Sequence, residues 1–197
     1  QEAALSDCDL LIAMGTRMDS VTVNDYTMIR SNQKLVMVYP EPSEFSQWQA
    51  DVAIASNVLP ALEALTKGIA APSEKRIQWR EKVHHEEVKF AQPGEIEVAG
   101  AVDMAKVITH FIDKVPQDCI NISDAGSFGR WISRYYRFNQ PDIEASPVSG
   151  AMGYGVPGGI GAQIAKPDKT VFVWVGDGGF TMTGHECAAI VQEGLPV

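Results

Sequence analysis

The sequence predicts an α/β protein made of two three-layer segments, each with a parallel sheet between helices. Short apolar runs rich in valine and isoleucine, which are typical of strands buried on both faces, alternate with helical stretches. These runs fall into two groups, and a charged stretch separates them. Alternation of strands and helices in each group favours parallel sheets covered by helices.

The first group occupies residues 1–66. Strands are expected over three apolar runs, residues 10–14, 35–39 and 51–55, and a helix is expected over residues 58–65. Pro40 and Pro42 end the second strand, because proline cannot donate a hydrogen bond to a sheet. Residues 67–100 are charged and contain Pro72, Pro93 and Gly94, which predicts a surface linker around a polar helix over 73–90.

The second group occupies residues 101–197. We expect an amphipathic helix over residues 101–115, a strand over 119–122, a small-residue helix over 158–165 and a second strand over 171–175. The segment 150–161 holds six glycines in twelve residues. Such density indicates close approach of the backbone to a ligand or to another helix.

The strand that begins at Val171 leads into a candidate metal site. Asp177 follows the strand, where open α/β sheets place their ligands. Gly176, Gly178 and Gly179 surround it without side chains, so backbone amides can approach an anion closely. A carboxylate among amides suits Mg2+ holding a phosphorylated cofactor.

Beyond this loop, Thr183 and Glu186 have the spacing of a capping box. The pattern predicts a helix over 184–193 with Thr183 as its N-cap, ended by Gly194 and Pro196.

Several motifs together resemble the thiamine diphosphate-dependent enzymes, in the acetolactate synthase and pyruvate oxidase branch. The resemblance is carried, in family order and spacing, by residues 6–19, 123–131, 135–138, 149–157, 167–170, 175–186 and 194–197. It implies that residues 1–66 are the C-terminal half of a central Rossmann-like domain. Residues 101–197 are then the N-terminal part of the thiamine diphosphate-binding domain, and the chain is an internal fragment of a longer enzyme.

The resemblance implies which residues bind the diphosphate of the cofactor. Asp177 matches a ligand of the bridging Mg2+, and Gly178 and Gly179 match amides that contact the diphosphate. A second loop, Gly126, Ser127 and Phe128, matches another diphosphate contact at a helix start, where unpaired amides favour an anion. Acetolactate synthases carry Gln-His where this chain has Ser127 and Phe128.

Two further residues match the part of the site that holds the other half of the cofactor. The carbonyl of Gly150 would accept a hydrogen bond from the 4′-amino group, and Met152 would hold the cofactor bent. The cofactor would stabilise a carbanion while the protein fixes its shape and excludes water.

The resemblance implies decarboxylation or ligation of a 2-oxo acid such as pyruvate, in a homodimer or homotetramer. The activating glutamate and the second metal ligand of the family match no residue here, so this chain is expected to contain no catalytic residue and to show no turnover alone. Two alternatives stay open: a non-catalytic FAD- or NAD-binding module, and an inactive family member with a structural or regulatory role.

The first group also resembles the region that contacts FAD in flavin-containing relatives. Gly15, Arg17, Glu41 and Asp51 fall near the matching positions, which makes FAD a further candidate cofactor. The alternative interpretation is that Arg17 and Asp19 form a surface salt-bridged turn.

Composition narrows the possible partners. The chain has 197 residues and a net charge of -9, which argues against nucleic acid because phosphate contacts need clustered Lys and Arg. No apolar run is long enough to span a membrane. Cys8, Cys119 and Cys187 are scattered and odd in number, which favours neither disulfides nor zinc and is consistent with a reducing cytoplasm.

Three polar positions near these motifs have open roles. Asp124 either orients the diphosphate loop or caps a turn. Arg130 and Arg134 either meet a substrate carboxylate or, as we favour, solvate their helix.

Overall fold

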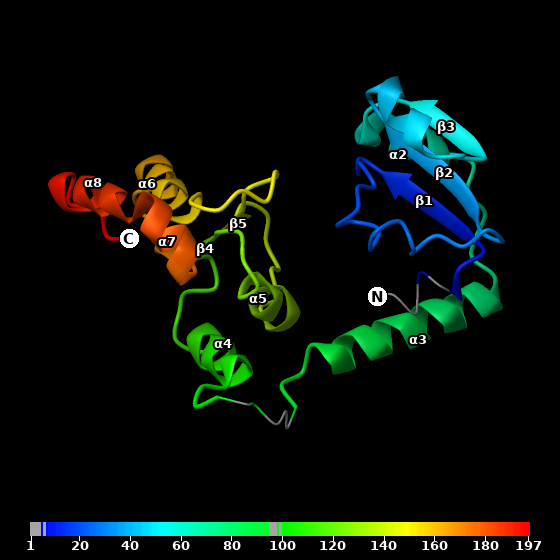
Figure 1. Cartoon of the computed structure of the whole chain (residues 1–197). Coiled ribbons are helices and arrows are strands. Elements are labelled where there is room, and N and C mark those ends of the chain that lie inside the picture. Colours follow the sequence, from blue (N-terminus) through cyan, green and yellow to red (C-terminus); the bar gives the residue numbers. More distant parts are fainter. Residues whose placement is uncertain (1–4, 6, 95–97, 99) are drawn as a thin grey trace. The chain divides into compact units, whose positions relative to one another are not determined.

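The computed structural model describes residues 5, 7–94, 98 and 100–197. It divides into two compact units, residues 1–87 and 88–197, each of which is described by itself (Figure 1). The division falls inside α3 (Glu74–Phe90), the polar helix predicted over 73–90. Part of the predicted linker, residues 95–97 and 99, lies outside the described residues.

The first unit contains a parallel sheet with the strand order β1-β2-β3. Its strands are close to the predicted positions: β1 (Leu10–Met14), β2 (Lys34–Tyr39) and β3 (Val52–Ala55). In this register Ile12 pairs with Val36, and Val38 pairs with Ile54. A 3-10 helix, η1 (Pro42–Gln47), follows β2, and α2 (Val58–Thr66) follows β3 as expected.

The two faces of β2 are both covered, as an apolar strand without alternation predicts. Met37 and Val38 are neighbours on opposite faces, and their exposed fractions are 1% and 0%. Met37 belongs to a cluster with Leu35, Ala13, Met18 and Val23.

The second unit contains a parallel sheet with the order β5-β4-β6, so β4 lies in the middle. Its strands are β4 (Ile120–Ser123), the short β5 (Glu144–Ala145) and β6 (Val171–Trp174). The helices are α4 (Met104–Ile112), α5 (Gly129–Tyr135), α6 (Gly155–Ala165), α7 (Asp177–Thr183) and α8 (Cys187–Gln192), and the 3-10 turn η2 (Gly184–Glu186) joins the last two.

Helices cover both faces of this sheet, which confirms the predicted α/β class. Ile122 of β4 belongs to the core cluster beside α6, and a Cβ built at Gly158 of α6 would lie 3.0 Å from its Cγ2. On the other face, Phe111 of α4 meets Phe172 and Trp174 edge to face, with ring centroids 4.5 and 4.6 Å apart.

Two helix predictions in this unit need correction. The first helix of this unit begins at Met104 because the Asp103 side chain caps it, accepting hydrogen bonds from the amides of Ala105 and Lys106. The helix predicted over 184–193 is present as η2 and α8, which follow directly after α7. Thr183 stands at the N-cap of η2 but is also the last residue of α7, and its side chain makes no capping hydrogen bond. The Thr183 hydroxyl donates to the carbonyl of Gly153 instead, at 3.0 Å.

The small-residue helix α6 extends three residues further toward the N-terminus than the predicted 158–165. Its glycines approach the sheet, rather than another helix, most closely. A Cβ built at Gly159 would lie 2.4 Å from Val173 Cγ2, whereas one at Gly161 would meet nothing within 4 Å.

We therefore expect Gly159→Ala to lower the free energy of unfolding by about 2 kcal/mol, because an overpacked core must shift. Gly161→Ala is the matched control in the same helix. It should stabilise the protein by up to about 1 kcal/mol through helix propensity. Urea unfolding of both variants checks this pair, and a stability gain in both would contradict the close packing of α6.

Candidate functional site

Three loops meet at one edge of the second sheet. They follow the carboxyl ends of β4, β5 and β6, and parallel strands bring those ends to the same edge. All the predicted cofactor-binding residues lie in these loops or in the first turn of α7, as residues 126–128, 150–152 and 176–179. Figure 1 shows β4, α6 and α7 together in this unit.

A buried carboxylate, Asp124, joins the three loops. Only 3% of the residue is exposed. Its Oδ1 accepts hydrogen bonds from the amides of Ala125, at 2.6 Å, and Gly153, at 3.0 Å. Its Oδ2 accepts from Gly153 and Gly155, each at 3.0 Å. The loop after β4 is thereby tied to the segment that begins α6.

Asp124 also packs closely against α7. A Cβ built at Gly179 would lie 2.8 Å from Asp124 Oδ2 and 3.1 Å from its Cγ. Gly179 is buried, and only a residue without a side chain fits between α7 and this carboxylate.

Phe128 brings the first loop beside the third. A Cβ built at Gly126 would lie 2.5 Å from the Phe128 ring, and one built at Gly176 would lie 3.4 Å from it. The ring therefore fills the space beside both glycines, and the backbone of Gly126 and Ser127 stays exposed.

Met152 lies against the first turn of α7. A Cβ built at Gly178 would come within 2.8 Å of Met152 Cε. Met152 is nevertheless 47% exposed. Gly150, two residues earlier, has a φ of +67° that favours glycine, and its amide donates to the carbonyl of Pro147 at 2.9 Å.

Asp177 is the first residue of α7 and its side chain is exposed. Its Oδ1 accepts a hydrogen bond from the amide of Gly178, at 2.8 Å. Within the part of the chain that the structure describes, no group of three or more His, Cys, Asp or Glu side chains could hold a metal ion. Asp177 thus lies among backbone amides and apart from such clusters, an arrangement that would leave positions around Mg2+ for waters and phosphate oxygens.

The loop after β4 has the donors that a diphosphate needs. Among the described residues, the amides of Gly126, Ser127 and Phe128 donate to no other group, and Gly126 and Ser127 are exposed. Neighbouring unpaired amides in a turn are suitable donors for an anion. These donors, the glycines of the third loop and the exposed Asp177 fit a diphosphate bound with Mg2+.

Arg134 has a role that the sequence did not reveal. Its Nε donates to the carbonyl of Phe90 at 2.8 Å, and its guanidinium lies 3.9 Å from the centroid of the Phe90 ring. The side chain thus fixes the end of α3 to α5 within the second unit, and it does not simply solvate its helix. Trp131 and Tyr135 stack with centroids 6.1 Å apart, and Arg130 is exposed.

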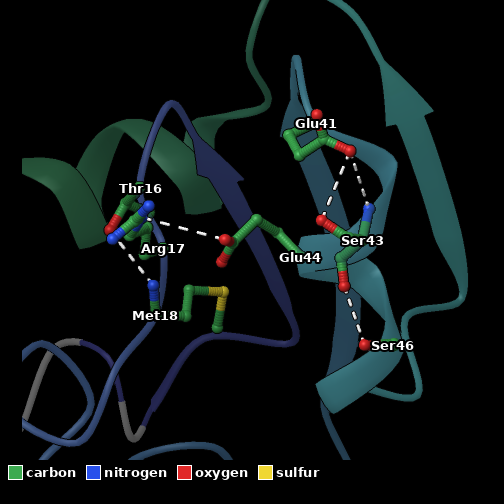
Figure 2. Close-up of polar contacts among 7 residues, drawn as sticks. All are labelled: Thr16, Arg17, Met18, Glu41, Ser43, Glu44 and Ser46. Atoms are coloured by element: carbon green, nitrogen blue, oxygen red, sulfur yellow. Dashed lines mark hydrogen bonds and ion pairs between the residues drawn. The ribbon is translucent and has the colours of Figure 1, made fainter.

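The corresponding edge of the first sheet carries three of the four residues matched to FAD contacts. Gly15, Arg17 and Glu41 follow the carboxyl ends of β1 and β2. Arg17 Nε lies 3.8 Å from the Glu44 carboxylate, and Glu41 accepts hydrogen bonds from the amide and hydroxyl of Ser43 (Figure 2). A hydrogen bond to Tyr39, and then the charge of Glu44, raise the pKa of Arg17.

The fourth residue, Asp51, is at the opposite edge. It precedes β3, where its carboxylate accepts hydrogen bonds from the Lys34 ammonium, at 2.7 Å, and from the amide of Leu35, at 2.9 Å. The expected salt bridge between Arg17 and Asp19 is replaced by other partners. Arg17 pairs with Glu44, and Asp19 accepts a hydrogen bond from the amide of Thr22.

Comparison with known proteins agrees with this geometry. Residues 124–197 match the family model "Thiamine pyrophosphate enzyme, C-terminal TPP binding domain". The matched segment begins at the carboxylate that joins the three loops. Over residues 124–197 the chain therefore belongs to the thiamine diphosphate-dependent enzymes, in their C-terminal cofactor-binding domain.

Within that family, the chain is similar to acetolactate synthase large subunits. It is 26% identical over 200 residues to the acetolactate synthase isozyme 2 large subunit of Escherichia coli (strain K12), covering 98% of this chain and 35% of that protein. It is 29% identical over 199 residues to the acetolactate synthase large subunit of Porphyra purpurea, covering 98% and 33%. The corresponding subunit of Lactococcus lactis is 28% identical over 198 residues, with 98% and 34% covered.

The chain thus spans about a third of the length of the curated relatives it matches. Among the described residues, no helix is both long and apolar enough to cross a membrane.

Proposed function

We propose that this chain forms the diphosphate- and Mg2+-binding part of an enzyme that decarboxylates or ligates 2-oxo acids, in the manner of an acetolactate synthase. The observation that carries the proposal is the convergence of three loops on Asp124, inside the segment that matches the cofactor-binding domain. The similarity to acetolactate synthases along nearly the whole chain supports the same reaction class.

Each loop has a distinct part in the proposed site. Asp177 would bind Mg2+, and the unpaired amides of residues 126–128 would bind the diphosphate. The carbonyl of Gly150 and the side chain of Met152 would orient the remainder of the cofactor. When bound, thiamine diphosphate supplies the stabilisation of negative charge on the carbon that loses or gains a bond.

Other parts of the proposal extend beyond this chain's own residues. The substrate class is a 2-oxo acid such as pyruvate, and the expected assembly is a homodimer or homotetramer in the cytoplasm. Neither the activating glutamate nor a second metal ligand is assigned to a residue of this chain, so activity is proposed only for the complete protein.

The test is calorimetric titration of the full-length protein with thiamine diphosphate, with and without Mg2+. We expect Asp177→Ala to weaken Mg2+-dependent binding by roughly 100-fold or more, since even residues behind a metal ligand often contribute 10- to 100-fold. His185→Ala is the matched control, because His185 is exposed and its Nε2 lies 3.4 Å from Glu186. Equal binding by the wild type and Asp177→Ala would overturn the proposed site.

A flavin is tested separately. If the edge of the first sheet binds FAD, flavin absorbance should accompany the purified protein and decrease in Arg17→Ala, which removes the cation beside Glu44. Flavin without any thiamine diphosphate binding would favour the alternative of a non-catalytic nucleotide-binding module.

A further inference from the structure

We propose that Asp124 is a positioning residue that sets the spacing between the two halves of the cofactor site. This inference rests on the proposed function. Asp177, Gly178 and the loop 126–128 would hold the diphosphate, whereas Gly150 and Met152 would hold the rest of the cofactor. Asp124 is the group that connects these two sets of residues.

The hydrogen bonds of Asp124 reach far along the chain. A residue that only caps its own turn would bond to nearby amides, as Asp124 does with Ala125. Its bonds to Gly153 and Gly155 instead reach 29 and 31 residues along the chain. A carboxylate accepts hydrogen bonds at both oxygens, so it can hold these amides together.

Hydrogen bonds hold the peptide groups on both sides of Gly153. Its amide donates to Asp124 and its carbonyl accepts from the Thr183 hydroxyl of α7, at 3.0 Å. Met152 is the preceding residue and lies against Gly178. The position of Met152 against α7 therefore depends on the hydrogen bonds that hold the adjacent Gly153.

Asp124 has little room to move. A Cβ at Gly155 would lie 3.2 Å from both Cβ and Oδ2 of Asp124, and one at Gly179 would lie 2.8 Å from Oδ2. Asp124 is thus enclosed between the first turns of α6 and α7, and the residue is buried. Packing of this kind transmits the position of one loop to the other.

The experiment uses two ligands that separate the halves of the site. Inorganic pyrophosphate with Mg2+ reports on the diphosphate half alone, whereas thiamine diphosphate with Mg2+ needs both halves. In the full-length protein, we expect Asp124→Asn to weaken thiamine diphosphate binding by at least about tenfold. The reason is that the amide nitrogen of Asn would face N–H donors. Pyrophosphate binding should change less than about twofold.

The matched control is Asp103→Asn, which changes a carboxylate that also accepts two backbone amides in the same unit. Asparagine is an equally good N-cap, so this variant should bind both ligands normally. Thr183→Val removes the other bond to Gly153 and should also weaken thiamine diphosphate binding selectively.

Hydrogen exchange gives a measurement that requires no bound cofactor. The amides of Gly153 and Gly155 should exchange slowly in the wild type and faster in Asp124→Asn, with no general increase across β4 and β6. Rapid exchange in the wild type, or equal weakening of both ligands by Asp124→Asn, would overturn the positioning role. If the wild type bound neither ligand, the proposed function would fail, and the exchange rates would still show whether Asp124 holds the loop.

Discussion

Gly179→Ala should lower the free energy of unfolding by about 3 kcal/mol, whereas Gly178→Ala should change it by less than about 1 kcal/mol. These neighbours lie in the same turn of α7 but face different groups. A new methyl group at residue 179 would lie 2.8 Å from Asp124 Oδ2 and 3.3 Å from Val175 Cγ2. The carboxylate cannot withdraw without losing the amides of Gly153 and Gly155.

At residue 178, the new methyl group would meet only Met152 Cε, at 2.8 Å. This atom is the end of a flexible side chain that is about half exposed, so it can move at little cost. Urea unfolding and cofactor titration of the two variants test the contrast. Gly178→Ala should keep stability while displacing Met152. A Gly179→Ala variant as stable as the wild type would show that Asp124 is not tightly enclosed.

Asn121→Ala should destabilise the second unit by about 3 kcal/mol. The Asn121 residue is 1% exposed in the central strand β4. Its Oδ1 accepts a hydrogen bond from Trp174 Nε1 at 2.9 Å, and its Nδ2 donates to the carbonyl of Cys119 at 3.3 Å. The substitution would leave a small cavity and an unpaired indole N–H, each of which typically costs about 1–3 kcal/mol.

A double-mutant cycle with Trp174→Phe measures the bond itself. We expect a coupling energy of about 1 kcal/mol between the two positions, since each single change removes the same bond. Additive effects of the two substitutions in urea unfolding would contradict the assigned bond.

The hydroxyl of Tyr136 lies near this bond. Burial, and then contact with Cys119 at 3.5 Å, raise its pKa.

The sequence was sufficient to predict most strands and long helices because their signals are local. An apolar run such as 35–39 indicates a strand by itself, and the polar run after Ser73 indicates an exposed helix. α7 was missed because two of its first three residues, Gly178 and Gly179, have poor helix propensity. The close contact of Gly179 with Asp124 explains why glycine occupies that position.

In the candidate site, too, the residues with a local signal could be found from the sequence, whereas the long-range contacts could not. The common location of Asp177 and the loop 126–128 could be predicted, because the carboxyl ends of parallel strands lie at the same edge of a sheet. Their roles in cofactor binding stay a prediction. Asp124 could not be assigned a role, because its decisive partners are 29 and 31 residues away and nothing near it in the chain indicates them. Arg134 was misjudged for the same reason, since Phe90 precedes it by 44 residues.

The close fit of Asp124 between α6 and α7 has a consequence for directed evolution of this protein. Positions 124, 155 and 179 compete for one small volume, so their tolerated side chains depend on one another. Libraries that vary them singly should return almost only the starting residues. Joint libraries should recover combinations in which a shorter acceptor at 124, such as serine, accompanies alanine at 155 or 179.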